Sequence, residues 1–137
     1  MYGLHLILDC KVNPASTHLL VNTNHVDSVM RNLTSELGMT LLQDPIIYSF
    51  PNIGDQEAGV TGTAIWAESH MTIHTWPELE YFSCDLYSCK EFDVDSAIAY
   101  LSEHFDIEEA AIVSVTRSEH LKQRTHNIKF NPLLSVA

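Results

Sequence analysis

The chain has 137 residues, 45% of them apolar, and carries a formal net charge of −11. This length predicts one domain with a hydrophobic core of its own. No apolar run approaches the roughly 18 residues of a membrane span, and the acidic balance excludes nucleic acid as an expected partner because phosphates would be repelled.

The charge is unevenly distributed. Residues 1–116 carry 17 acidic and three basic side chains, whereas the other four basic residues lie at Arg117 and beyond. We therefore expect a single domain over residues 1–117 and an irregular basic tail over 118–137. The excess of acidic residues over residues 1–116, which we call the acidic body, is compatible with a cationic substrate. An ordinary solubilising surface is the commoner explanation of such a charge. The first residues lack the basic region of a signal peptide, so we expect a cytoplasmic protein with free thiols.

Hydrophobic periodicity divides the domain into strands and helices in a definite order. Residues 26–37 are apolar at helical spacing, with Asn24 as the expected N-cap and Gly38 as the expected stop. Pro45, which lacks a backbone N–H, indicates an edge strand or a bulge. The expected elements are, in chain order, a strand at 3–9, a helix at 25–37, strands at 39–50, 60–67, 70–75 and 81–89, a helix at 93–105 and a strand at 110–115.

This order of elements determines the expected fold class. Helices separated by runs of strands predict an α+β fold, a two-layer sandwich of a mainly antiparallel sheet with two helices on one face. Asp93 or Asp95 is expected to cap the second helix.

One segment concentrates reactive side chains: Glu68-Ser69-His70-Met71-Thr72-Ile73-His74-Thr75-Trp76-Pro77-Glu78. Cys89 follows shortly after it. If residues 70–75 are extended, alternation places Ser69 and His74 on opposite faces of the strand. A static Ser–His pair would need a kink or a break in the chain, and no Gly-x-Ser-x-Gly elbow exposes a nucleophile. This pattern disfavours an ordinary serine hydrolase.

A zinc site is the next interpretation. His70, His74, Cys84 and Cys89 are all residue types that bind zinc. However, the chain lacks His-Glu-x-x-His and Cys-x-x-Cys spacings, and histidines four residues apart converge on a helix but not on a strand. We therefore expect no metal site, and we expect Cys10 and Cys84 to be structural.

Three stretches carry serine, histidine and cysteine in a characteristic order and spacing. They are Gly59-Val60-Thr61-Gly62, the segment 68–78, and Asp85-Leu86-Tyr87-Ser88-Cys89, accompanied by Gly3, His5, Leu6 and Asp9 in the first strand. Together they resemble the prokaryotic S-adenosylmethionine decarboxylase proenzymes, a pyruvoyl-dependent family. The resemblance extends from about Gly3 to Arg117.

The resemblance implies that the protein processes itself. The Ser69 hydroxyl attacks the carbonyl of Glu68, and the chain is then cut between residues 68 and 69. The products are a β chain of residues 1–68 and an α chain of residues 69–137 whose first residue has become a pyruvoyl group. This cofactor forms a Schiff base with a substrate amine and accepts the electrons left by departing CO₂.

The resemblance also assigns roles to single residues. His74 assists proton transfer during processing, and Thr61 takes the place of a serine that stabilises the processing intermediate. Threonine keeps the hydroxyl but adds a methyl group and a stiffer χ1. Cys89 returns a proton to the substrate α-carbon as a general acid. Glu78 is expected to bind ribose hydroxyls, and Phe50 is expected to stack on adenine.

Other residues near the motif have secondary roles in this interpretation. His70 is expected to orient the backbone near the cut, and Trp76-Pro77 is expected to shape a turn rather than contact substrate. The loop of residues 52–58 is longer than expected for the family.

The implied activity is decarboxylation of S-adenosylmethionine, which supplies the aminopropyl donor for spermidine synthesis. The implied assembly is a homodimer of processed chain pairs, with two sheets stacked as an αββα sandwich and active sites near the interface. Two alternatives stay open. The same pyruvoyl chemistry could act on arginine or ornithine, as the loop 51–58 and the acidic body suggest, or the chain could be a pseudoenzyme subunit that never cleaves.

Overall fold

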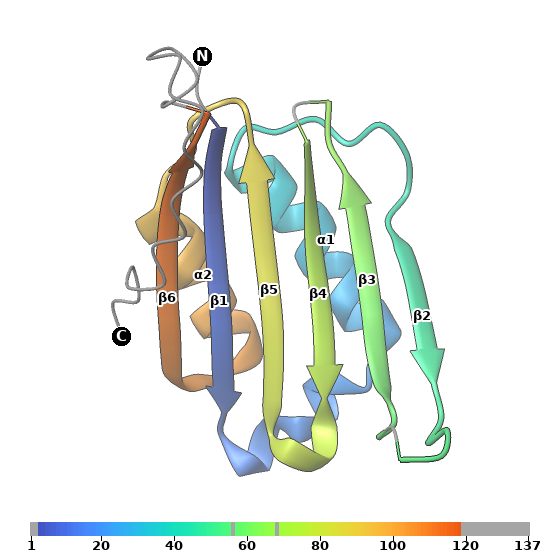
Figure 1. Ribbon diagram of the computed structural model, residues 1–137. Coiled ribbons are helices and arrows are strands. Elements are labelled where there is room, and N and C mark those ends of the chain that lie inside the picture. The colour runs from blue at the N-terminus through green and yellow to red at the C-terminus, as the bar shows by residue number, and fades with distance from the viewer. Residues whose placement is uncertain (1–2, 56, 68, 119–137) are drawn as a thin grey trace.

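The computed structural model describes residues 3–55, 57–67 and 69–118. In this part of the chain, strands form one antiparallel sheet in the order β2-β3-β4-β5-β1-β6 (Figure 1). The elements are β1 (Gly3–Val12), the 3-10 helix η1 (Pro14–Leu20), α1 (Thr23–Glu36), β2 (Ile46–Phe50), β3 (Gly59–Ile65), β4 (Ser69–Trp76), the 3-10 helix η2 (Pro77–Leu79), β5 (Tyr81–Ser88), α2 (Val94–Phe105) and β6 (Ile107–Arg117).

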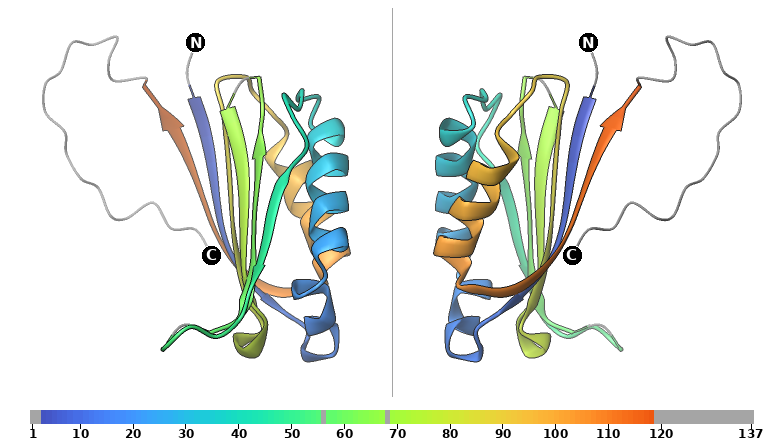
Figure 2. Two further views of the ribbon diagram at one scale, coloured as in Figure 1. Left: turned by 90° about the vertical axis from the view of Figure 1, so that its right-hand side faces the viewer. Right: turned by 90° about the vertical axis from the view of Figure 1, so that its left-hand side faces the viewer.

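The helices α1 and α2 lie side by side on one face of the sheet (Figure 2). This arrangement confirms the predicted α+β sandwich, including the order of its strands and α-helices. No described element covers the opposite face, which we call the open face. None of the described helices is long and apolar enough to cross a membrane.

The core lies between the sheet and the two helices. In β4 and β5 every second residue is buried, so Met71, Ile73 and Phe82 point toward the helices. Leu33 of α1 and Leu101 of α2 are fully buried against them. Burying a large apolar side chain contributes about 1.5–3 kcal/mol relative to leaving it exposed. The residues of opposite parity, including several polar and aromatic side chains, remain on the open face.

The first helix begins earlier than predicted. It starts at Thr23, and its N-cap is Asn22 rather than Asn24, because the Asn22 side chain accepts a hydrogen bond from the backbone N–H of His25 at 3.0 Å. The predicted start at residue 25 was therefore two residues late. Asp93 caps α2 as predicted, with its carboxylate accepting from the N–H of Ser96.

The strand expected at 39–50 was wrong over its first half. Only Ile46–Phe50 forms β2, and Leu41 makes a single bridge to Trp66. Pro45 directly precedes β2, which is an edge strand, so the proline fits the edge position that its missing N–H predicts. The two 3-10 helices were not predicted, and β6 extends well beyond the expected 110–115 because it pairs along nearly all of β1.

Candidate active site

Strand β4 keeps the two most reactive predicted residues apart. Its register with β5 is unbroken from Ser69, opposite Ser88, to Trp76, opposite Tyr81. Ser69 and His74 therefore lie about 17 Å apart along the strand, and alternation places them on opposite faces. The kink that a static Ser–His pair would need is absent from β4.

His74 instead meets Thr61 on the open face. The two residues are directly opposite in the pairing of β3 with β4, and a hydrogen bond joins Thr61 Oγ1 to His74 Nδ1 at 2.5 Å. Burial lowers the pKa of His74 below its ordinary value of 6.5. The imidazole is consequently neutral at neutral pH, and its Nδ1 can accept the proton of the Thr61 hydroxyl.

Aromatic rings surround this pair. Phe50, the last residue of β2, stacks on His74 with ring centroids 5.6 Å apart and an interplanar angle of 13°. The rings of Trp76 and His74 meet in a T-shaped arrangement with their centroids 4.1 Å apart. Trp76 was assigned to a turn from the sequence, but it ends β4 and shares the face of His74 because the two are separated by one residue. Strand alternation alone could have identified it.

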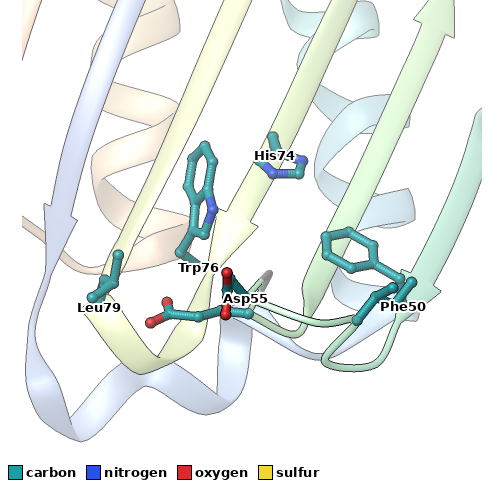
Figure 3. Close-up of a pocket in the computed structure, with 7 residues that line it drawn as sticks. Phe50, Asp55, His74, Trp76 and Leu79 are labelled. Carbon is teal, nitrogen blue, oxygen red and sulfur yellow. The ribbon is translucent and has the colours of Figure 1, made fainter.

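These residues form one wall of a pocket of about 580 Å³ (Figure 3), a size suited to a small ligand. The β2–β3 loop supplies another wall and brings two carboxylates into it. One of them, Glu57, has a buried Oε2 atom without a hydrogen-bond partner among the described residues. The lining residues are Phe50, Ile53, Asp55, Glu57, His74, Trp76 and Leu79.

We call this cavity the open-face pocket. The sequence identified Phe50 and His74 as site residues but not Asp55 and Glu57, whose loop was noted for its length and as a reason to consider arginine or ornithine as substrate. Glu78, the expected ribose ligand, lies in η2 with an exposed side chain and is not part of the pocket lining, although its neighbour Leu79 is.

The other predicted residues gather at the opposite end of the sheet, where β4 starts and β5 ends (Figure 1). Ser69 is half-buried and pairs with Ser88, which directly precedes the exposed Cys89. The backbone N–H of Trp66 donates to the Ser69 carbonyl at 2.9 Å, which joins the residue after β3 to the first residue of β4. Glu68 lies outside the described residues.

Further hydrogen bonds hold the segment after β5. The backbone N–H of Lys90 donates to Ser88 Oγ at 2.9 Å, and the Lys90 ammonium donates to the Gly38 carbonyl at 2.7 Å. The first bond spans Cys89, and the second anchors the residue that follows it. Ser69 and Cys89 thus lie at the same end of strands β4 and β5. We call this end of the sheet the β4 start.

The zinc-binding residue types are divided between the two faces. His70 and His74 lie on the open face, whereas Cys84 is fully buried on the helix side. Within the described residues no three His, Cys, Asp or Glu side chains are placed to hold a metal ion. Burial raises the pKa of the Cys10 thiol to about 12 and also raises that of Cys84, so neither thiol is poised to react.

Comparison with known proteins finds relatives that share one family description. The family model of S-adenosylmethionine decarboxylase matches residues 4–118. The chain is 30% identical to an S-adenosylmethionine decarboxylase proenzyme of Clostridium botulinum over 118 residues, covering 85% of this chain and 95% of the relative. It is 32% identical to the proenzyme of Thermosipho africanus over 123 residues, covering 86% and 85%.

A solved structure shares the fold. The adenosylmethionine decarboxylase of Aquifex aeolicus superposes with a TM-score of 0.71 at 21% sequence identity, covering 95% of this chain and 97% of that one. At this identity the likeness establishes the arrangement of strands and helices.

Proposed function

Because the chain belongs to the S-adenosylmethionine decarboxylase family, we propose that it is a proenzyme that cuts itself between residues 68 and 69 and then decarboxylates S-adenosylmethionine. The product would serve as the aminopropyl donor for spermidine synthesis. The observation that carries the proposal is the pairing of Ser69 with Ser88, since it places the residue proposed as nucleophile at the same end of the sheet as Cys89, which follows Ser88 in the chain.

Self-cleavage uses only atoms of the chain and water. Ser69 Oγ attacks the carbonyl carbon of residue 68, and the amide becomes an ester. Removal of the Cα proton of residue 69 then expels the carboxylate, leaving residue 69 as dehydroalanine. Water converts this residue to a pyruvoyl group and releases ammonia. The hydrogen bond from the Trp66 backbone N–H to the Ser69 carbonyl supports this step because it holds together two residues that bracket the proposed cut.

The surroundings of residue 69 fit the pyruvoyl group. Ser69 is the first residue of β4, so after the cut its end of the chain remains paired with β5 through Ser88. The group supplies an electron-withdrawing carbonyl when it is present. Cys89, exposed and next to Ser88, is the residue that would hold a proton for the substrate α-carbon. Phe50 and Glu78 are the residues proposed to bind the adenosine part.

A second copy of the chain would complete the site. In one copy, Ser69 and His74 lie at opposite ends of β4. Two copies whose open faces stack with their β4 strands antiparallel would set the β4 start of each at the level of the open-face pocket of the other, and Ser69 would reach the gap from the end of its strand rather than across the open face. Packed sheets lie about 10 Å apart, a gap that side chains and substrate can fill. We therefore propose a homodimer with an αββα arrangement in which both copies contribute to each site.

The test of self-cleavage is denaturing mass spectrometry of the purified protein. Two masses that divide before residue 69 are expected for the wild type, and Ser69→Ala is expected to stay full length. Ser35→Ala, on the exposed face of α1, is the matched control and should cleave normally. A single intact mass for the wild type after prolonged incubation would favour a pseudoenzyme.

Substrate identity is tested separately by CO₂ release. The processed protein is incubated with S-adenosylmethionine, arginine or ornithine, and release is expected only from S-adenosylmethionine. Release from arginine or ornithine alone would overturn the proposed substrate while leaving the self-cleavage intact.

The shared site is tested by complementation between two inactive variants. Ser69→Ala keeps His74, and His74→Ala keeps Ser69. When both are expressed together, mixed dimers should restore cleavage of the His74→Ala chain, because its Ser69 meets His74 of the other copy. Absence of any restored cleavage in dimers shown to be mixed would place the complete site within one copy.

A further inference from the structure

The two carboxylates of the open-face pocket have no role in the function described so far. Asp55 and Glu57 belong to the loop between β2 and β3 and line the cavity with Phe50 and Trp76. We propose that Asp55 and Glu57 are specificity-determining residues that select a positively charged sulfonium substrate over its neutral thioether counterpart. This inference rests on the proposed function, because it concerns how that same site chooses its substrate.

A hydrogen bond and a turn constrain the described residues of this loop. Asn52 Oδ1 accepts a hydrogen bond from the Ala58 N–H at 2.6 Å, which closes the base of the loop. Gly54 has a φ of 58°, the left-handed conformation that a tight turn requires and that glycine adopts at little cost. Asp55 of this loop and Trp76 of β4 line the same pocket (Figure 3).

The charge of the pocket lining has one sign. Among the described residues, its ionisable members are the carboxylates of Asp55 and Glu57 together with His74, whose pKa is lowered, and no described lysine or arginine lines it. The remaining wall is aromatic and aliphatic. Aromatic faces attract cations through their quadrupole, and carboxylates attract them through their charge. A cationic group is thus favoured in this pocket by both kinds of wall.

Glu57 also has unused hydrogen-bonding capacity. Its Oε2 atom is buried and has no partner among the described residues. A buried carboxylate oxygen is normally satisfied by a donor, and leaving it unpaired is costly. The adenosyl part of S-adenosylmethionine carries hydroxyl and amino donors, and its sulfonium carries the positive charge. One ligand of this chemistry can satisfy both requirements of the pocket.

The experiment compares two ligands that differ by one methyl group and one charge. They are 5′-deoxy-5′-dimethylthioadenosinium, a sulfonium cation, and 5′-methylthioadenosine, its neutral thioether. Neither has a carboxylate to lose, so dissociation constants can be measured by calorimetry on the full chain whether or not it is active. The variants are Asp55→Asn and Glu57→Gln, with Glu103→Gln on the exposed surface of α2 as the matched control.

The wild type should bind the cation more tightly than the thioether. Each pocket variant should reduce that preference about three- to tenfold, the range expected for one partly solvated charge pair, with affinity for the thioether nearly unchanged. Glu103→Gln should leave the preference intact. The preference should also weaken as salt is raised.

Two results would overturn the inference. One is a wild-type protein that binds both ligands equally, and the other is a double variant, Asp55→Asn with Glu57→Gln, that keeps the full preference. A change in dimer dissociation without a change in preference would show that the carboxylates pair with a second copy instead. Failure of the proposed function has a different signature. In that case the wild type would neither be cut before residue 69 nor release CO₂.

Discussion

At the scale of single residues, the pair of Thr61 and His74 is the best-defined chemical feature of the open face. The expected serine is replaced by threonine, whose extra methyl restricts χ1. The hydroxyl nevertheless lies 2.5 Å from His74 Nδ1 because the two residues are direct cross-strand partners. The geometry of the sheet therefore retains the hydrogen bond despite the substitution.

Removing the Thr61 hydroxyl should slow self-cleavage. Thr61→Val keeps the shape of the side chain but loses the hydroxyl, and we expect the cleavage rate to fall about a hundredfold, the scale of one proton-transfer contribution. Thr61→Ser should retain most of the rate. The decay of full-length protein is followed by denaturing mass spectrometry. Thr63→Val, on the same strand and face, is the control, and an equal loss there would assign the effect to packing.

The lowered pKa of His74 predicts how cleavage and stability depend on pH. Burial favours the neutral imidazole, so cleavage should be insensitive to pH near neutrality and should slow as acidification protonates His74 below its ordinary pKa of 6.5. The folded state binds fewer protons at His74 than the unfolded state between their two pKa values. Stability therefore decreases as pH falls through this window.

Urea unfolding of the wild type and of His74→Gln measures the stability part of this prediction. The wild type should lose more stability than the variant between about pH 7 and pH 5, where an ordinary histidine becomes protonated. Parallel pH profiles for the two proteins would contradict it.

At the scale of elements, the connection from β3 to β4 is anchored to α1. The Trp66 indole N–H donates to Thr34 Oγ1 at 2.9 Å, and the Thr34 hydroxyl donates to the Met30 carbonyl at 2.6 Å. Both side chains are buried. The backbone of Ala67 is also held, by a hydrogen bond to the Thr40 carbonyl at 2.9 Å. Trp66 is thus fixed to α1, and Ala67 to the segment that follows this helix.

Breaking this buried hydrogen bond should destabilise the fold. Thr34→Val leaves the Trp66 N–H without an acceptor, which costs about 1–3 kcal/mol of unfolding free energy. Urea denaturation measures the change. Thr17→Val in η1 has the same side-chain alteration at a less buried site and should stay within about 0.5 kcal/mol. A similar loss in both variants would refute the special role of the Trp66–Thr34 contact.

At the scale of the whole molecule, the segments on either side of the proposed cut are interleaved in one sheet. Strands β1, β2 and β3 precede residue 69, and β4, β5 and β6 follow it. In the sheet order, β3 pairs with β4, while β1 lies between β5 and β6 and pairs with both. Three strand pairings therefore hold the two segments together, and none of them depends on the peptide bond between residues 68 and 69.

This interleaving predicts that cleavage leaves the molecule folded. The two chains should elute together from a sizing column under native conditions, with the far-UV circular dichroism of the uncleaved Ser69→Ala variant. They should separate only in denaturant. Separation of the chains in native buffer would show that the three strand pairings do not suffice.

Much of this architecture could be derived from local sequence signals. The order of strands and α-helices follows from hydrophobic periodicity, the cap of α2 from Asp93, and the edge position of β2 from Pro45. The separation of Ser69 from His74 follows from strand alternation, and it is this separation that argues for a second copy. The start of α1 was misplaced because Asn22 and Asn24 are equally good caps by residue type, and only the folded backbone selects one.

The sequence by itself determined the family, the element order and the opposite faces of Ser69 and His74, because each depends on residue type and short-range periodicity. Only the tertiary structure decided which side chains line the open-face pocket. Asp55 and Glu57 reach Trp76 through a loop closed by Asn52 and Ala58 and through the pairing of β3 with β4. Such contacts join residues distant in the chain, and no local pattern encodes the geometry that brings them together.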